Sequence, residues 1–194
     1  MSIRFATESD IPAMLAIYGP YVEHTAYSFE YTVPTQAEFA RRLQDYTAQF
    51  PWLVWEEDGT VLGYAYGSAP FERAAYRWCA EVSVYIAPQA QGKGIGSGLY
   101  RVLEHILWLQ GYQVIYALIS TENTGSVAFH QRMGYTTVTQ MPACGIKFGR
   151  QIGILYMEKR SNSVELPTAF PEPFHNFVQN DDKLKQLSSL FTLS

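Results

Sequence analysis

The sequence has little cysteine, a small net charge and no long apolar run, and each of these limits what the protein can be. Its two cysteines, Cys79 and Cys144, lie far apart and outside any CxxC pair or cysteine–histidine cluster. We therefore expect reduced thiols of a cytoplasmic protein, without a disulfide framework or a metal site. A net charge of −4, with no run of lysine or arginine, argues against nucleic-acid binding. The sequence contains no 18-residue apolar stretch and no N-terminal signal region, so we expect a protein that neither spans a membrane nor is secreted.

Aromatic residues, by contrast, are abundant. The chain of 194 residues contains 14 tyrosines and 11 phenylalanines. A chain of this length suits one domain with a sizeable core. The ring content indicates a pocket or an interface lined by aromatic side chains in addition to an ordinary core.

Hydrophobic periodicity predicts a mixed α/β layer fold. Pro20 is expected to kink or divide the first helix, and Asp58-Gly59 predicts a hairpin turn. The expected strands are 2–6, 52–56, 60–68, 78–87, 114–119, 135–140 and 149–159. The expected helices are one after Asp10, one over 35–47, one after Gly98 and one over 123–133.

We assign one domain to residues 1–160 and a tail to residues 161–194. Three prolines at 167, 171 and 173 break any regular element at the start of the tail. Leucines and a phenylalanine at helical spacing then predict a short last helix, which needs docking on an apolar surface to be stable; they are Leu184, Leu187, Leu190 and Phe191.

The strongest local signal is a glycine-rich segment between a predicted strand and a predicted helix. Closely spaced glycines let backbone N–H groups point at one spot, and a helix N-terminus adds a positive dipole end, so the segment predicts an anion cradle that suits a pyrophosphate. The segment matches neither GxxxxGK[ST] nor GxGxxG. The remaining alternative is a flexible turn with incidental glycines. The segment comprises Gln91, Gly92, Lys93, Gly94, Ile95, Gly96, Ser97 and Gly98.

Gln91, Gly94 and Gly96 fill the pattern Gln/Arg-x-x-Gly-x-Gly/Ala, which resembles the coenzyme A pyrophosphate loop of the GNAT N-acetyltransferases. Further matches over about residues 2–160 resemble the phosphinothricin and methionine sulfoximine acetyltransferases of that superfamily. They include the segments Arg73-Ala74-Ala75-Tyr76-Arg77-Trp78, Glu81-Val82-Ser83-Val84-Tyr85, Met133-Gly134-Tyr135 and Gly145-Ile146-Lys147-Phe148-Gly149-Arg150. The resemblance implies a GNAT-type mixed central sheet with helices on both faces, acetyl-CoA as co-substrate without a metal, and a homodimer.

The resemblance also implies roles for individual residues. Glu81 is the expected general base, and its alternative is a surface carboxylate at a strand end. His130 is expected to protonate the leaving thiolate or to contact the acceptor, unless it is a hydrogen-bonded structural residue. Asn123 is expected to hold the cofactor and to cap a helix. Backbone groups of Val84, Tyr85 and Ile86 are expected to pair with the pantetheine arm.

Acceptor binding is the less constrained part of the prediction. Arg73, beside Phe71 and Tyr76, is the expected partner of an acceptor carboxylate, and Lys147 and Arg150 are weaker candidates. Gln151 and Gly153 depart from the family pattern, which has Trp and then an acidic residue, so we expect a roomier pocket there.

The predicted function is acetyl-CoA-dependent acetylation of the amino group of a small amino acid or analogue, by direct transfer in a ternary complex. Two alternatives remain: a protein N-terminal or lysine acetyltransferase, and a non-catalytic acyl-CoA-binding sensor. The segment 18–31, rich in aromatic residues, indicates a lid over a small pocket and so favours the small acceptor.

Overall fold

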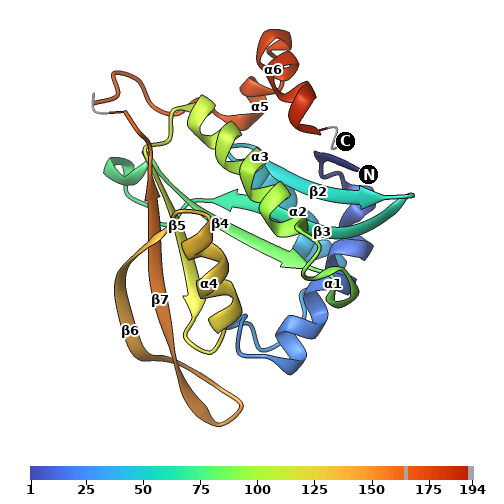
Figure 1. The fold of residues 1–194 in the computed structure, drawn as a ribbon, viewed down its shortest axis with the longest axis vertical. Helices are drawn as coiled ribbons and strands as arrows, with labels where there is room; N and C mark the ends of the chain where they lie inside the picture. Colours follow the sequence, from blue (N-terminus) through green and yellow to red (C-terminus); the bar gives the residue numbers. More distant parts are fainter. Residues whose placement is uncertain (164–165, 192–194) are drawn as a thin grey trace.

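The computed structural model describes residues 1–163 and 166–191 and contains a seven-stranded sheet in the order β1-β2-β3-β4-β5-β7-β6 (Figure 1). Neighbouring strands are antiparallel except for the parallel pair β4 and β5. The predicted mixed sheet is thus confirmed. The strands are β1 Ser2–Phe5, β2 Trp52–Glu57, β3 Thr60–Ser68, β4 Cys79–Ile86, β5 Val114–Ser120, β6 Thr136–Lys147 and β7 Arg150–Arg160.

Helices cover both faces of the sheet, as predicted. Helices α1 (Ile11–His24) and α2 (Gln36–Thr47) pack on one face, where Phe39 of α2 lies 5.5 Å from the ring of Trp52 in β2. Helix α3 (Ile95–Gln110) packs across β2, β3 and β4 on the other face, next to α4 (Thr124–Arg132). Among the described residues, no helix is long and apolar enough to cross a membrane.

Helix α1 runs without interruption through Pro20 to His24, so the expected division at this proline is wrong. Pro20 lacks an N–H group and removes one backbone hydrogen bond. The helix is nonetheless retained because its buried face, with Met14, Ile17 and Val22, packs against the core.

Strands β4 and β5 pair only at their beginnings, where residues Cys79–Glu81 face Val114–Tyr116. Beyond Glu81 the two strands separate, while β4 stays paired with β3 as far as Ile86. One edge of β4 is therefore without a partner strand over Val82–Ile86, and this gap in the sheet lies beside α4 (Figure 1).

Two hairpins end in two-residue turns with positive φ angles. Asp58 and Gly59 have φ values of 48° and 76°, and Phe148 and Gly149 have 52° and 72°. Two successive positive φ angles are typical of the type I′ turn, which matches the twist of the flanking strands. The turn predicted at Asp58-Gly59 is confirmed.

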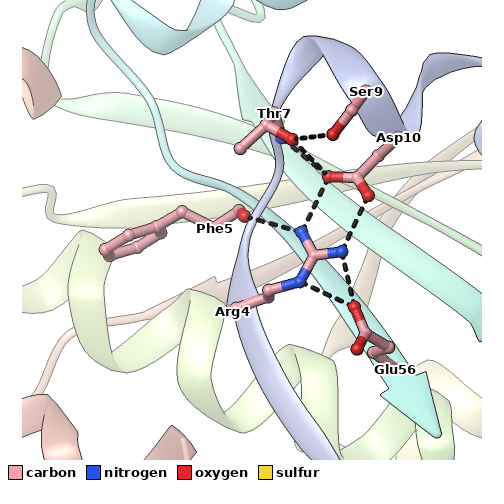
Figure 2. A network of polar contacts seen from close by, with 6 residues as sticks. All are labelled: Arg4, Phe5, Thr7, Ser9, Asp10 and Glu56. Carbon is pink, nitrogen blue, oxygen red and sulfur yellow. Dashed lines mark hydrogen bonds and ion pairs between the residues drawn. The ribbon is translucent and has the colours of Figure 1, made fainter. Parts of the chain in front are cut away.

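An ion-pair network joins the N-terminal strand to the start of α1 and to β2 (Figure 2). Arg4 donates to Asp10 at 2.7 and 2.8 Å and to Glu56 at 2.8 and 2.6 Å. Burial of Asp10 opposes its ionisation, but the hydrogen bonds from Arg4 and Thr7 outweigh burial and lower the pKa of this carboxyl.

The tail forms two helices, α5 (Phe174–Phe177) and α6 (Asp181–Phe191), and docks on the domain. Phe177 and Leu187 are fully buried, and Phe5 of β1 lies within 5.2 Å of the rings of both Phe174 and Phe191. Helix α6 lies where the sequence predicts a last helix, and it packs against β1 and α3 of the same chain.

Candidate functional site

A cavity of about 560 Å³ lies between the free edge of β4, the glycine-rich segment and the start of α4; we call it the loop cavity. Nine of the predicted cofactor-binding residues line it: Val84, Ile86, Gln91, Gly92, Gly94, Ile95, Gly96, Ser97 and Asn123. Residues that the sequence analysis missed complete the lining: Tyr21, Tyr27, Ala90, Gly125, Ser126, Phe129 and Arg132. Lys93 is exposed and does not line the cavity.

The backbone at Gly92 and Gly94 suits an anion. Their φ angles are 76° and 82°, a region that other residues rarely adopt, and no described atom outside the glycine and its chain neighbours lies within 4 Å of the position where a Cβ would stand. Gly94 is the N-cap of α3, so N–H groups of the first helical turn have no partner inside the helix. Open space beside unpaired N–H groups and the positive end of the helix dipole fits a pyrophosphate.

The free edge of β4 offers further backbone groups. Ala87 N–H donates to the carbonyl oxygen of Leu62 at 2.9 Å. In an antiparallel ladder, every second residue directs its backbone N–H and carbonyl groups toward the partner strand. Tyr85 therefore directs its backbone groups toward β3, whereas Val84 and Ile86 direct theirs toward the cavity. Tyr21 already donates its hydroxyl proton to the Ile86 carbonyl at 2.7 Å. Val84 therefore has the most accessible groups for an extended ligand, whereas the predicted contact through the Tyr85 backbone is not supported.

Asn123 is the N-cap of α4. Its side-chain oxygen accepts a hydrogen bond from Ser126 N–H at 3.0 Å, which confirms the predicted capping role. The residue also lines the loop cavity and a smaller cavity of about 70 Å³ beside it, which we call the inner cavity. Capping orients the amide group at the junction of the two cavities.

Glu81 stands where β4 and β5 separate, opposite Tyr116 in the register of the parallel pair. Burial alone raises the pKa of this carboxyl from its ordinary value of 4.5 to about 7. Within residues 1–163 and 166–191, no hydrogen bond or ion pair engages the carboxylate. A carboxyl group in this state can take up and release a proton near neutral pH.

His130 of α4 is buried and held at both ring nitrogens. Nδ1 lies 2.8 Å from the Ser126 carbonyl oxygen, and Nε2 lies 3.0 Å from the Tyr100 hydroxyl. Because a carbonyl only accepts, Nδ1 carries the proton and Nε2 accepts from Tyr100 in the neutral ring. Burial lowers the pKa of His130 and favours this neutral form, which has no proton on Nε2 to donate. His130 and Tyr100 both line the inner cavity.

The residues predicted to bind the acceptor lie outside the loop and inner cavities. Phe71 and Tyr76 are partly exposed, with ring centroids 4.6 Å apart, and Phe71 lies 6.1 Å from the ring of Tyr116, the neighbour of Glu81. Both line a third cavity of about 620 Å³ that extends to Phe170 of the tail. Arg73 is exposed on the same loop and lines none of these three cavities.

Lys147 and Arg150 are engaged in contacts within the protein, against the prediction that either receives an acceptor carboxylate. The Lys147 ammonium donates to the carbonyl oxygens of Val22 and Ser28, both at 2.7 Å. Arg150 pairs with Glu122 through two hydrogen bonds.

The space expected at Gly153 is already filled. A Cβ at this position would lie 2.8 Å from the carbonyl oxygen of Met141, because β6 bulges toward β7 between Met141 and Gly145. The prediction of a roomier pocket at Gly153 is therefore wrong. The glycine serves the close approach of two strands.

Residues 3–155 match the acetyltransferase (GNAT) domain family. The chain belongs to the GNAT acetyltransferases. It is therefore an N-acetyltransferase, as predicted. It is 37% identical over 175 residues to phosphinothricin N-acetyltransferase of Alcaligenes faecalis, covering 88% of this chain and 87% of the relative. It is 35% identical to L-methionine sulfoximine/L-methionine sulfone acetyltransferase of Salmonella typhimurium, covering 87% and 99%.

A solved GNAT structure has the same fold. The phosphinothricin acetyltransferase of Sinorhizobium meliloti, in complex with acetyl-CoA, aligns with a TM-score of 0.84 and 33% identity over 89% of this chain and 95% of that chain.

Proposed function

We propose that this GNAT enzyme transfers the acetyl group of acetyl-CoA to the amino group of a small amino acid or analogue of the methionine sulfoximine and phosphinothricin type. The observation that carries the proposal is Glu81, an unpaired and half-buried carboxyl with a pKa of about 7 at the gap between β4 and β5. The transfer takes place directly between the two substrates in a ternary complex.

The donor site is the loop cavity. Its positive-φ glycines, the N-terminus of α3 and the free backbone edge at Val84 fit the pyrophosphate and the extended arm of a coenzyme A thioester. The relative from Sinorhizobium meliloti, which holds acetyl-CoA, supports this assignment. Acetyl-CoA supplies an activated thioester, and the protein holds it beside the strand that carries Glu81.

The proton chemistry requires a base. An α-amino group has a pKa of about 8, so most of it is protonated at neutral pH and not nucleophilic. Glu81, ionised on the alkaline side of about pH 7, takes the proton that the amine must lose. The neutral amine then attacks the thioester carbonyl, the carbon–sulfur bond breaks, and the proton that the attacking nitrogen still has to lose passes to the departing thiolate, so that coenzyme A leaves as its thiol.

We infer the acceptor class from the relatives and from the loop before Glu81. Two relatives at 37% and 35% identity are named for phosphinothricin and for methionine sulfoximine or sulfone, which are all amino acid analogues. Arg73 supplies a guanidinium that can pair with their carboxylate. The exposed Phe71 and Tyr76 beside it support a homodimer, in which these rings are covered. Sedimentation as a monomer at micromolar concentration would contradict the dimer.

Release of free thiol from acetyl-CoA tests the proposal. The acceptors are L-methionine sulfoximine, phosphinothricin, L-methionine and its carboxamide, and a peptide with a free N-terminus. We expect thiol release with the free amino acids and much less with the peptide. Release with the peptide alone would favour a protein acetyltransferase, and release with none of them would favour a non-catalytic acyl-CoA-binding protein.

A further inference from the structure

Lys147 is a buried cation that the proposed chemistry does not use. Only 3% of the residue is exposed, and its ammonium group donates 2.7 Å hydrogen bonds to the carbonyl oxygens of Val22 and Ser28. No carboxylate in the described part of the chain forms an ion pair with it. The acid whose charge reaches it, Glu30, pairs with Arg42. A buried lysine without a carboxylate partner is costly and calls for a reason.

The two carbonyl groups explain where the lysine is held. Val22 lies in the last turn of α1, which ends at His24, so its carbonyl has no partner within the helix. The negative end of the helix dipole attracts a cation at this place. Ser28 lies in the segment of residues 25–31 that follows the helix, which we call the 25–31 segment. Lys147 thus ties the end of α1 to this segment.

Neighbouring residues of the β6–β7 hairpin contact the same segment. The Tyr31 hydroxyl donates to the carbonyl oxygen of Ile146. The ring of Phe29 lies against Gly145, where a Cβ would come within 2.4 Å of it. Three successive hairpin residues, Gly145 to Lys147, therefore hold the 25–31 segment, although more than 110 residues separate the two in the sequence.

The 25–31 segment and the end of α1 form the aromatic wall of the donor site. Tyr21 and Tyr27 line both the loop cavity and the inner cavity. The Tyr21 hydroxyl also bridges the Ile86 carbonyl of β4 and the side-chain amide of Gln91 in the glycine-rich segment, at 2.7 and 3.0 Å. A shift of the segment would therefore move the wall of the cavity and the contacts of the cradle.

We propose that Lys147 is a positioning residue, which holds the 25–31 segment so that Tyr21 and Tyr27 form the wall of the donor site. The β6–β7 hairpin thereby supports coenzyme A binding without touching the ligand. The inference rests on the proposed donor site. Binding of coenzyme A to the unaltered protein tests that site separately. If the unaltered protein does not bind coenzyme A, the donor site itself is contradicted; if the unaltered protein and the Lys147 variant both bind it normally, the role of Lys147 is contradicted.

The test compares Lys147→Met with Lys159→Met, using titration calorimetry with coenzyme A and no acceptor. Lys159 is a matched control, because it too is a lysine of the β6–β7 pair with a buried partner, but its contacts with Glu104 of α3, at 2.6 Å, and with the ring of Tyr135 lie outside the 25–31 segment. We expect Lys147→Met to weaken coenzyme A binding about tenfold, the scale of one charge-assisted hydrogen bond. Lys159→Met should lower the melting temperature and leave binding within about twofold.

Hydrogen exchange gives a second readout, since amides of residues 25–31 should exchange faster in Lys147→Met and not in Lys159→Met. Equal losses of affinity in both variants, or unchanged affinity in Lys147→Met, would overturn the proposal. If Lys147→Met does not fold, Tyr31→Phe removes one exposed hydrogen bond of the same contact. It should weaken binding about threefold, and unchanged affinity would again overturn the proposal.

Discussion

Two carboxylates, the half-buried Glu81 at the gap of the sheet and the buried Glu104 where α3 packs against β7, show how removal from water can serve different ends. Glu81 and Glu104 both have a pKa raised above the ordinary value, chiefly by burial. Glu104 accepts a 2.6 Å hydrogen bond from the Lys159 ammonium, which in turn lies over the ring of Tyr135. Glu81 has no such partner. The ion pair with Lys159 holds the Glu104 carboxylate in place for structure. Glu81 has no ion pair and is free to exchange a proton.

The largest expected effect separates the two carboxylates by activity. Glu81→Gln keeps the shape of the side chain and removes the base, so we expect kcat to fall about 10²–10⁴-fold, the usual worth of general base catalysis. The acetyl-CoA dissociation constant should barely change. The matched variant Glu104→Gln should keep kcat per folded molecule, measured under single-turnover conditions. Near-full kcat in Glu81→Gln, with chemistry limiting the rate, would show that the proton leaves by another route.

Stability should change in opposite directions in the same two variants. Because the pKa of Glu81 is raised from 4.5 to about 7, its ionisation destabilises the fold progressively between these pH values, by at most about 3 kcal/mol. Glu81→Gln should therefore be more stable than the unaltered protein above pH 7 and no more stable near pH 4. Glu104→Gln leaves Lys159 unpaired and should cost about 1–3 kcal/mol at pH 7. Denaturant melts at several pH values measure both, and a loss of stability in Glu81→Gln at pH 8 would contradict the comparison.

A smaller effect is expected in the glycine cradle. Gly94→Asn tolerates the positive φ angle and places a side chain in the open space beside the glycine. We expect coenzyme A affinity to fall at least about tenfold, on the scale of one lost charge-assisted hydrogen bond. Gly59→Asn is the control, since its φ of 76° and its open surroundings match those of Gly94, but it lies in a hairpin turn. Equal affinities of the two variants in calorimetry would remove the basis for the cradle.

The smallest effect concerns Arg73, which is exposed in the structure. An ion pair at such a place contributes about 1 kcal/mol or less, so Arg73→Ala should raise KM for L-methionine sulfoximine about three- to fivefold. The carboxamide of the same acceptor has no carboxylate and should be unaffected. The ratio of the two KM values measures the contact, and equal changes on both acceptors would show that Arg73 does not bind the carboxylate.

The lining of the loop cavity could largely be predicted from the sequence because its signals are local. Glycine spacing, the strand before it and the helix after it all lie within about 20 residues, and the positive φ angles of Gly92 and Gly94 follow from that pattern. The cap at Asn123 is equally local. The sequence did not identify Tyr21 and Tyr27 as residues that line the loop cavity, although the aromatic content of residues 18–31 indicated a lid over a pocket.

The acceptor side could be predicted much less well, because its contacts join distant parts of the chain. Lys147 and Arg150 looked like free cations, yet their partners Val22, Ser28 and Glu122 lie 28 to 125 residues away. Gly153 looked like added space, but the bulge in β6 fills it. The local sequence around a charged residue or a glycine does not predict which distant residue pairs with the charge or which strand packs against the glycine.

The pH dependence of kcat/KM tests the central claim most directly. With acceptor concentrations well below KM and the titration of the acceptor amine itself subtracted, the account predicts that kcat/KM rises with pH through an inflection near 7 as Glu81 becomes the carboxylate. The residual activity of Glu81→Gln should lack this inflection. The same inflection in Glu81→Gln would contradict the assignment of Glu81 as the base.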